Sequence, residues 1–196
     1  MYVKNEVFFM NKLSLMVFTS VLFLSGFKGI KTSNNITFEF SVLTKQDIIL
    51  SLQVHNDARK EVGLSEISWS NSLAEDALLW AKNLAFKDEM YHSSSESRPG
   101  QGENLSYSYR SSNGNPTFSE TPGKDASTAW YNEIKDYTYA EIGSSKNANV
   151  VIGHYTQMIW NTTTELGMAR AVSASGSVYV VARYSPQGNW IGRQPY

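Results

Sequence analysis

Two apolar, strand-like segments lie close together near the C-terminus, and they constrain the fold more than any other feature. They span residues 166–172 and 178–184, and only the five residues Ser-Ala-Ser-Gly-Ser separate them. A connection this short joins antiparallel neighbours, because parallel strands need a crossover of a dozen or more residues. The sequence therefore predicts a β-hairpin and an antiparallel sheet.

Three helices are predicted upstream of this hairpin, over residues 45–62, 72–84 and 126–137. In the first, Ile48, Leu52, Ala58 and Val62 recur at helical spacing, His55 lies on the same stripe, and a glycine follows at residue 63. The stretches 92–102, 106–124 and 143–149 are rich in Ser, Gly, Pro and Asn and are predicted as loops. Helices that precede strands favour an α+β fold over a doubly wound sheet.

The N-terminus has the pattern of an export signal. Lys12 precedes an apolar run over residues 13–27, which is shorter than the roughly 20 residues of a membrane span. We predict a signal peptide over residues 1–27, with Met10 as an alternative start and an uncleaved anchor as the competing interpretation. Residues 28–44 are interpreted as a β-prone lead-in, and residues 45–196 as one domain. The mature protein is then extracellular, or periplasmic in a Gram-negative source, without a membrane span.

The composition excludes some classes of function. Seventeen Lys and Arg against 18 Asp and Glu give a formal net charge of −1, and no basic cluster is present, so we expect no nucleic-acid partner. The chain has no cysteine. Thiolate chemistry and cysteine ligation of zinc are therefore excluded, and the fold must be stable without disulfides.

Four ionisable residues are candidates for chemistry: His92, Glu103, Glu133 and His154. Glu133 lies on the apolar stripe of the third predicted helix, where an unpaired carboxylate costs several kcal/mol. Histidine is a natural partner for such a group, as acid, base or metal ligand. The sequence has no HExxH pattern, so spacing alone does not bring the four residues together.

Several segments resemble one known family. The segment Gly-His-Tyr-Thr-Gln-Met-Ile-Trp occupies residues 153–160, and Tyr-Val-Val-Ala-Arg-Tyr-Ser-Pro-Gln-Gly-Asn-Trp occupies 179–190. Upstream lie His-Asn-Asp-Ala-Arg at 55–59, Gly-Glu-Asn-Leu at 102–105 and Trp-Tyr-Asn-Glu-Ile at 130–134. Together they resemble the CAP superfamily, or SCP domains: cysteine-rich secretory proteins, antigen 5 and pathogenesis-related group-one proteins. The resemblance implies a three-layer α-β-α sandwich with a central antiparallel sheet, here from a cysteine-free branch.

The resemblance also implies a site in a central cavity. His92 and His154 would bind Zn²⁺ or another divalent cation, with Glu103 and Glu133 as supporting groups or general bases. The residues that would line the cavity are Tyr155, Thr156 and Gln157. His55 stands outside this set, and we interpret it as a hydrogen-bonded core residue.

Three functions remain open from the sequence. The first is an extracellular binding, defence or signalling module with an unknown ligand, either lipid, sterol or protein. The second is a metal-dependent hydrolase that uses the same four residues. The third is a sterol or fatty-acid binding protein. A serine mechanism is disfavoured, because Tyr109 occupies the position at which some relatives have the serine.

Overall fold

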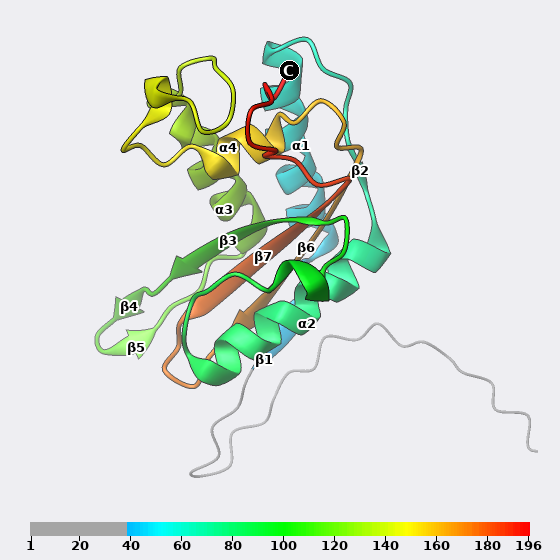
Figure 1. Ribbon diagram of the computed structural model, residues 1–196. Helices are drawn as coiled ribbons and strands as arrows, with labels where there is room; N and C mark the ends of the chain where they lie inside the picture. Colours follow the sequence, from blue (N-terminus) through cyan, green and yellow to red (C-terminus); the bar gives the residue numbers. More distant parts are fainter. Residues whose placement is uncertain (1–38) are drawn as a thin grey trace, which may run out of the picture.

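The computed structural model describes residues 39–196 (Figure 1). The predicted signal peptide, residues 1–27, lies outside the described residues, as do residues 28–38 of the lead-in. Among the described residues, no helix combines the length and the apolar character that crossing a membrane requires.

A five-stranded sheet forms the middle of the molecule. Its main strands follow the order β1-β6-β7-β3 with every neighbouring pair antiparallel, and the short β2 pairs in parallel with β6. The predicted hairpin is confirmed, and Val172 pairs with Val178 at its closed end. The strands are β1 (Glu39–Val42), β2 (Ser68–Trp69), β3 (Gly102–Ser108), β6 (Glu165–Val172) and β7 (Val178–Ser185).

Helices cover both faces of this sheet (Figure 1). One face packs against α2 (Asn71–Lys87), and the other packs against α1 (Lys45–Glu61), α3 (Pro122–Tyr131) and α4 (Gly153–Met158). Alternation along β6 separates the two cores, because Ala169 and Ala171 face α2 whereas Leu166 and Met168 face the other helices. The predicted three-layer α-β-α sandwich is confirmed.

A glycine allows α2 to approach the sheet closely. A Cβ atom at Gly167 of β6 would lie 2.2 Å from the backbone nitrogen of Ala74. Only glycine fits there without moving the backbone of α2.

Two predicted loops and the lead-in contain strands. β3 (Gly102–Ser108) includes the end of the first predicted loop and the start of the second. It forms because it pairs with β7 along its whole length, and this pairing outweighs the weak strand propensity of Gly, Asn and Ser. β1 lies in the segment interpreted as a lead-in and adds an edge strand to β6. A small hairpin, β4 (Ser111–Ser112) and β5 (Asn115–Pro116), projects from the second loop.

The third helix differs from its prediction at both ends. α3 begins at Pro122. Proline is tolerated in the first turn of a helix, because the N–H that it lacks would have no partner within the helix there. It ends at Tyr131, and a 3₁₀ turn, η2 (Asn132–Lys135), carries Glu133. The short helix α4 was not predicted. Two further 3₁₀ turns are η1 (Ser95–Ser97) and η3 (Ser145–Asn147).

The inner face of α1 is polar. Asp47, Ser51, His55 and Arg59 recur every four residues, and all four are buried. The predicted apolar positions Ile48, Leu52 and Val62 are only partly buried against the same core. Since buried polar groups are stable only with hydrogen-bond partners, this polar stripe must be anchored to other elements.

Asp47 and His55 anchor α1 to two of those elements. The Asp47 carboxylate accepts hydrogen bonds from the backbone N–H groups of Gly123 (2.9 Å) and Lys124 (2.8 Å) in the first turn of α3. His55 Nδ1 donates to the Ser51 carbonyl (2.8 Å), so its Nε2 accepts from the Tyr184 hydroxyl (2.9 Å). His55 is therefore a hydrogen-bonded core residue, as interpreted from the sequence.

Arg59 anchors the other end of α1 through backbone carbonyls alone. Its Nη1 donates to Met158 (3.1 Å) and Trp160 (2.8 Å), its Nη2 to Thr163 (3.0 Å) and its Nε to Ser65 (2.7 Å). The guanidinium thus holds the segment that follows α4 against α1.

Replacing His55 by Gln tests the polar stripe. Burial lowers the pKa of His55 from 6.5 to about 4. A histidine with a lowered folded-state pKa contributes stability that is complete above about pH 6.5 and is lost progressively as the pH falls from there to about 4. Between about pH 7 and pH 4.5 the wild type should lose about 2 kcal/mol more unfolding free energy than His55→Gln, measured by urea denaturation. Parallel pH profiles for the two proteins would contradict this assignment.

Candidate functional site

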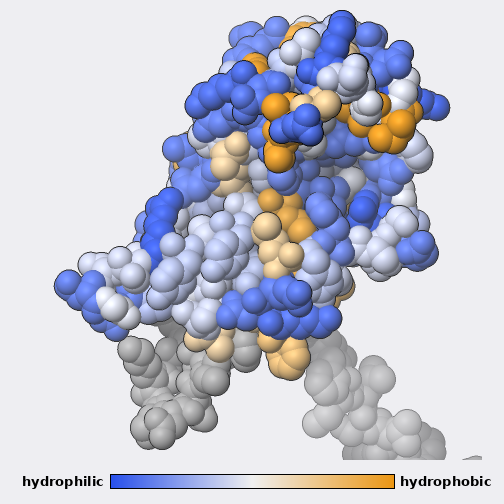
Figure 2. Space-filling model, turned by 60° about the vertical axis from the view of Figure 1, so that its left-hand side comes forward, coloured by the Kyte–Doolittle hydropathy of each residue, from blue (hydrophilic) through white to orange (hydrophobic). Residues whose placement is uncertain are grey.

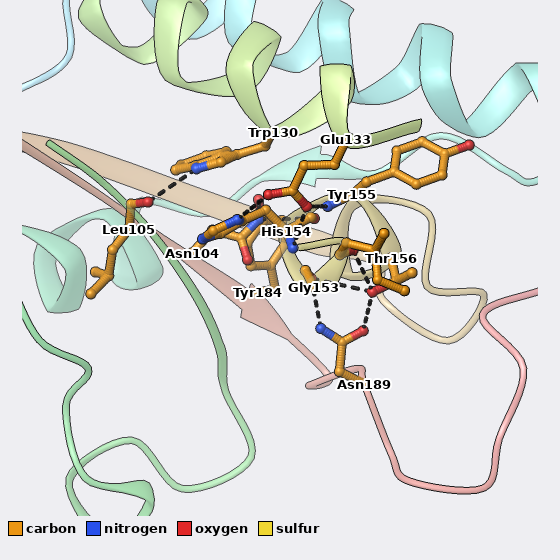
Figure 3. A network of polar contacts seen from close by, with 11 residues as sticks. Asn104, Leu105, Trp130, Glu133, Gly153, His154, Tyr155, Thr156, Tyr184 and Asn189 are labelled. Carbon is orange, nitrogen blue, oxygen red and sulfur yellow. Dashed lines mark hydrogen bonds and ion pairs between the residues drawn. The ribbon is translucent and has the colours of Figure 1, made fainter. Parts of the chain in front are cut away.

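Glu133 fixes both the ring and the backbone of His154 (Figure 3). One carboxylate oxygen accepts from His154 Nδ1 at 2.5 Å. The other accepts from the backbone N–H groups of His154 and Tyr155, both at 3.0 Å. The carboxylate therefore satisfies two free amides at the start of α4, and it directs the Nε2 side of the imidazole away from itself.

Two further contacts hold His154 in place (Figure 3). The indole of Trp130 stacks on the imidazole with ring centroids 6.0 Å apart and planes inclined by 16°, and the indole N–H donates to the Leu105 carbonyl. The side-chain amide of Asn104 donates to the His154 carbonyl (3.1 Å) and to the Tyr184 hydroxyl (3.0 Å). The Tyr184 hydroxyl in turn bonds to His55, so the polar stripe of α1 reaches this site.

Glu103 forms the second carboxylate–imidazole pair. Its Oε1 accepts from His92 Nδ1 (2.7 Å) and from the backbone N–H of Ser93 (3.0 Å). Its Oε2 accepts from the Ser93 hydroxyl (2.7 Å) and pairs with Arg183 Nη2 (3.1 Å). Burial raises the pKa of Glu103, but the hydrogen bonds from His92 and Ser93 and the charge of Arg183 outweigh it and hold that pKa below its usual value.

Sequence reasoning missed Arg183 and Ser93. Arg183 is 4% exposed, and its Nε and Nη1 have no hydrogen-bond partner within the part of the chain that the structure describes. A charged residue within the apolar strand Tyr-Val-Val-Ala-Arg-Tyr was the available signal, since an arginine on a buried strand needs a carboxylate nearby. Ser93 gave no such signal.

The two pairs flank the free edge of the sheet. Glu103 and Asn104 are neighbours on the edge strand β3, and alternation directs them to opposite faces. The His92 side chain is 57% exposed and that of His154 is 27% exposed, so both rings are accessible to solvent. Over residues 39–196, no group of three or more His, Asp or Glu side chains is arranged to hold a metal ion.

The predicted lining residues Tyr155, Thr156 and Gln157 are buried in α4. The Thr156 hydroxyl donates to Asn189 Oδ1 (2.8 Å), as Figure 3 shows, and the Gln157 side chain accepts from the N–H of Gly188 (2.9 Å). Their polar atoms therefore join α4 to the chain after β7.

Gly102 brings β3 close to α4. A Cβ atom at Gly102 would lie 2.2 Å from the side-chain oxygen of Gln157. The glycine of the Gly-Glu-Asn-Leu segment thus lets Asn104 approach His154 of α4, which it supports.

Comparisons with known proteins agree with this architecture. Residues 52–184 match the sequence profile of the cysteine-rich secretory protein family, abbreviated CAP. Pathogenesis-related leaf protein 4 of Solanum lycopersicum is 36% identical over 145 residues, which cover 74% of this chain and 80% of that protein. Golgi-associated plant pathogenesis-related protein 1 of Homo sapiens is 33% identical over 140 residues, which cover 71% and 82%.

A solved structure described as NaASP2 with Zn²⁺ is also similar. It superposes with a TM-score of 0.66 at 25% identity and covers 80% of this chain and 87% of that chain. The matched profile spans both carboxylate–imidazole pairs and most of the sheet. The chain therefore belongs to the cysteine-rich secretory protein (CAP) family, although it contains no cysteine.

Proposed function

We propose that this CAP protein is an extracellular binding module that holds a divalent cation, with zinc as the first candidate, between His92 and His154. One observation carries the proposal. Each imidazole directs Nδ1 to a glutamate carboxylate, which leaves Nε2 as the nitrogen available for a ligand. This carboxylate–histidine arrangement is the usual support for a metal-bound imidazole, and imidazole is a common zinc ligand.

The donor set fits a site with two protein ligands. Zinc prefers four ligands, so water or a bound partner would supply the remaining two. Such a cation would add Lewis-acid character and an open coordination position to the rim of the sheet. The solved relative whose description includes Zn²⁺ supports the same choice of metal.

The contacts of the glutamates favour an orienting role over a general base. Glu133 accepts three hydrogen bonds and Glu103 accepts three hydrogen bonds and an arginine contact. A carboxylate so fully engaged has little capacity left to take a proton from water. We therefore prefer a binding role to a hydrolase, in keeping with pathogenesis-related relatives and with the export signal predicted at residues 1–27.

A zinc titration of the full chain tests the site directly. Calorimetry should give one zinc per chain, and His92→Ala and His154→Ala should each weaken binding by at least about tenfold. Binding should also weaken from about pH 7 to pH 5, because protons compete with the metal for imidazole nitrogen. Gln53→Ala, on the exposed face of α1, serves as a control, since this side chain lies outside the site. A folded wild type that binds no zinc would sink the proposal.

Glu133→Gln tests the orienting role separately. The amide keeps the size of the side chain but removes its charge and one acceptor, so zinc affinity should fall about 10- to 100-fold. Glu141→Gln, on an exposed loop, is the matched control. Equal zinc affinity in Glu133→Gln and wild type would show that Glu133 only caps α4.

A further inference from the structure

The sheet face beneath α3 is mainly apolar except for one row of residues that crosses the strands. The pairing register places Ser41, Arg170, Val180 and Ser106 side by side across β1, β6, β7 and β3. On β6 the flanking positions on the same face, Met168 and Val172, are buried in the apolar core. Three of the four residues in this cross-sheet row are polar where a core face should be apolar. Local violations of the binary pattern are expected at functional sites.

The cross-sheet row forms the floor of a hollow. Two adjoining cavities, of about 180 and 330 Å³, share Arg170, Ser119 and Pro122 in their walls. The first extends to Ser106 and the second to Ser41, so together they form a groove across the sheet beside the start of α3. Neither cavity contains His92, Glu103, Glu133 or His154, so this polar groove is separate from the candidate metal site.

Charges in the groove are nearly balanced. Arg110 and Arg170 are opposed by Asp125 and Glu120 in its walls, and Arg110 lies 3.8 Å from Asp125. Asp47 adds a further carboxyl group near Arg170; burial raises the pKa of this group, and the charge of Arg170 offsets only part of that rise. A groove with three carboxyl groups and two arginines does not favour a phosphate or a carboxylate over a neutral ligand.

The remaining walls suit a polyhydroxylated ligand. Serine and threonine hydroxyls line both cavities: Ser41, Thr44, Ser106, Ser108, Thr117 and Ser119. Phe118 also contributes, with 43% of its surface exposed, and offers an apolar ring face at the rim. The projecting part of the molecule that carries the β4–β5 hairpin is mainly blue to white in Figure 2, whereas orange side chains lie at the top of the view and in a narrow band through its middle.

We propose that the polar groove binds a neutral oligosaccharide. Sugar hydroxyls can donate to Asp125 and Glu120 and accept from Arg170 at once, which neither a simple anion nor an aliphatic chain can do. The C–H faces of a sugar ring can pack on Phe118. This binding does not depend on the metal site, so either proposal can fail alone.

The test uses the full chain and three neutral probes, maltotriose, cellotriose and tri-N-acetylchitotriose, with inorganic phosphate as an anionic comparison. At least one trisaccharide should bind with a dissociation constant of about 1 mM or below. Arg170→Met should weaken that binding by at least about tenfold, because a charged hydrogen-bond donor is lost. Ser106→Val, which suits a strand and removes one hydroxyl, should also weaken it. Arg193→Met, an exposed arginine outside the groove, should bind as the wild type does.

A titration of the wild type with each trisaccharide, followed by amide chemical shifts, locates the binding site without relying on the folding of any variant. Shifts on titration should concentrate at residues 106–108, 117–120 and 170. The proposal is overturned if no trisaccharide binds, if the shifts lie elsewhere, or if Arg170→Met and Ser106→Val fold and bind as tightly as the wild type. Phosphate that binds the groove more tightly than any trisaccharide would also overturn it, because the groove would then be an anion site.

Discussion

The buried polar stripe of α1 organises this molecule. The side chains of Asp47, His55 and Arg59 each bond a different element. These elements are the first turn of α3, the strand β7 and the backbone after α4, respectively. Because every one of these groups would be costly to bury alone, the packing of three elements around α1 is specified by hydrogen bonds as well as by apolar contact. A chain without cysteine thereby gains fixed connections between distant segments that a disulfide could otherwise provide.

The candidate metal site depends on the same stripe. His55 bonds the Tyr184 hydroxyl, Tyr184 accepts from Asn104, and Asn104 holds the carbonyl of His154. The imidazole that we propose as a metal ligand is thus connected to α1 through a continuous set of buried bonds, and Glu133 fixes it from the other side. Precise placement of a metal ligand requires such support.

Much of the fold was predictable, because the hairpin consists of two short apolar runs joined by a five-residue loop and the first two helices have apolar residues at helical spacing. β3 was not, since Gly102 to Ser108 has little strand propensity and is held by its pairing with β7. The four His and Glu residues were grouped only through the family resemblance. Arg183 was missed because it meets Glu103 across 80 positions of sequence, and no spacing rule reaches that far. Ser93 lies only ten positions before Glu103, but a serine in a serine-rich loop carries no signal of its own. The polar stripe was masked by the apolar residues that alternate with it.

These long connections determine how the chain can acquire its structure. The hydrogen-bond partner of His55 is Tyr184, 129 positions later in the sequence, and one partner of Arg59 is Trp160, 101 positions later. Loops of this size close slowly, so the rate-limiting step should involve nearly the whole chain rather than a local nucleus. During synthesis, α1 leaves the ribosome long before its partners exist. A nascent chain that stops short of β7 cannot complete the fold, so the final packing around α1 is postponed until β7 has been translated.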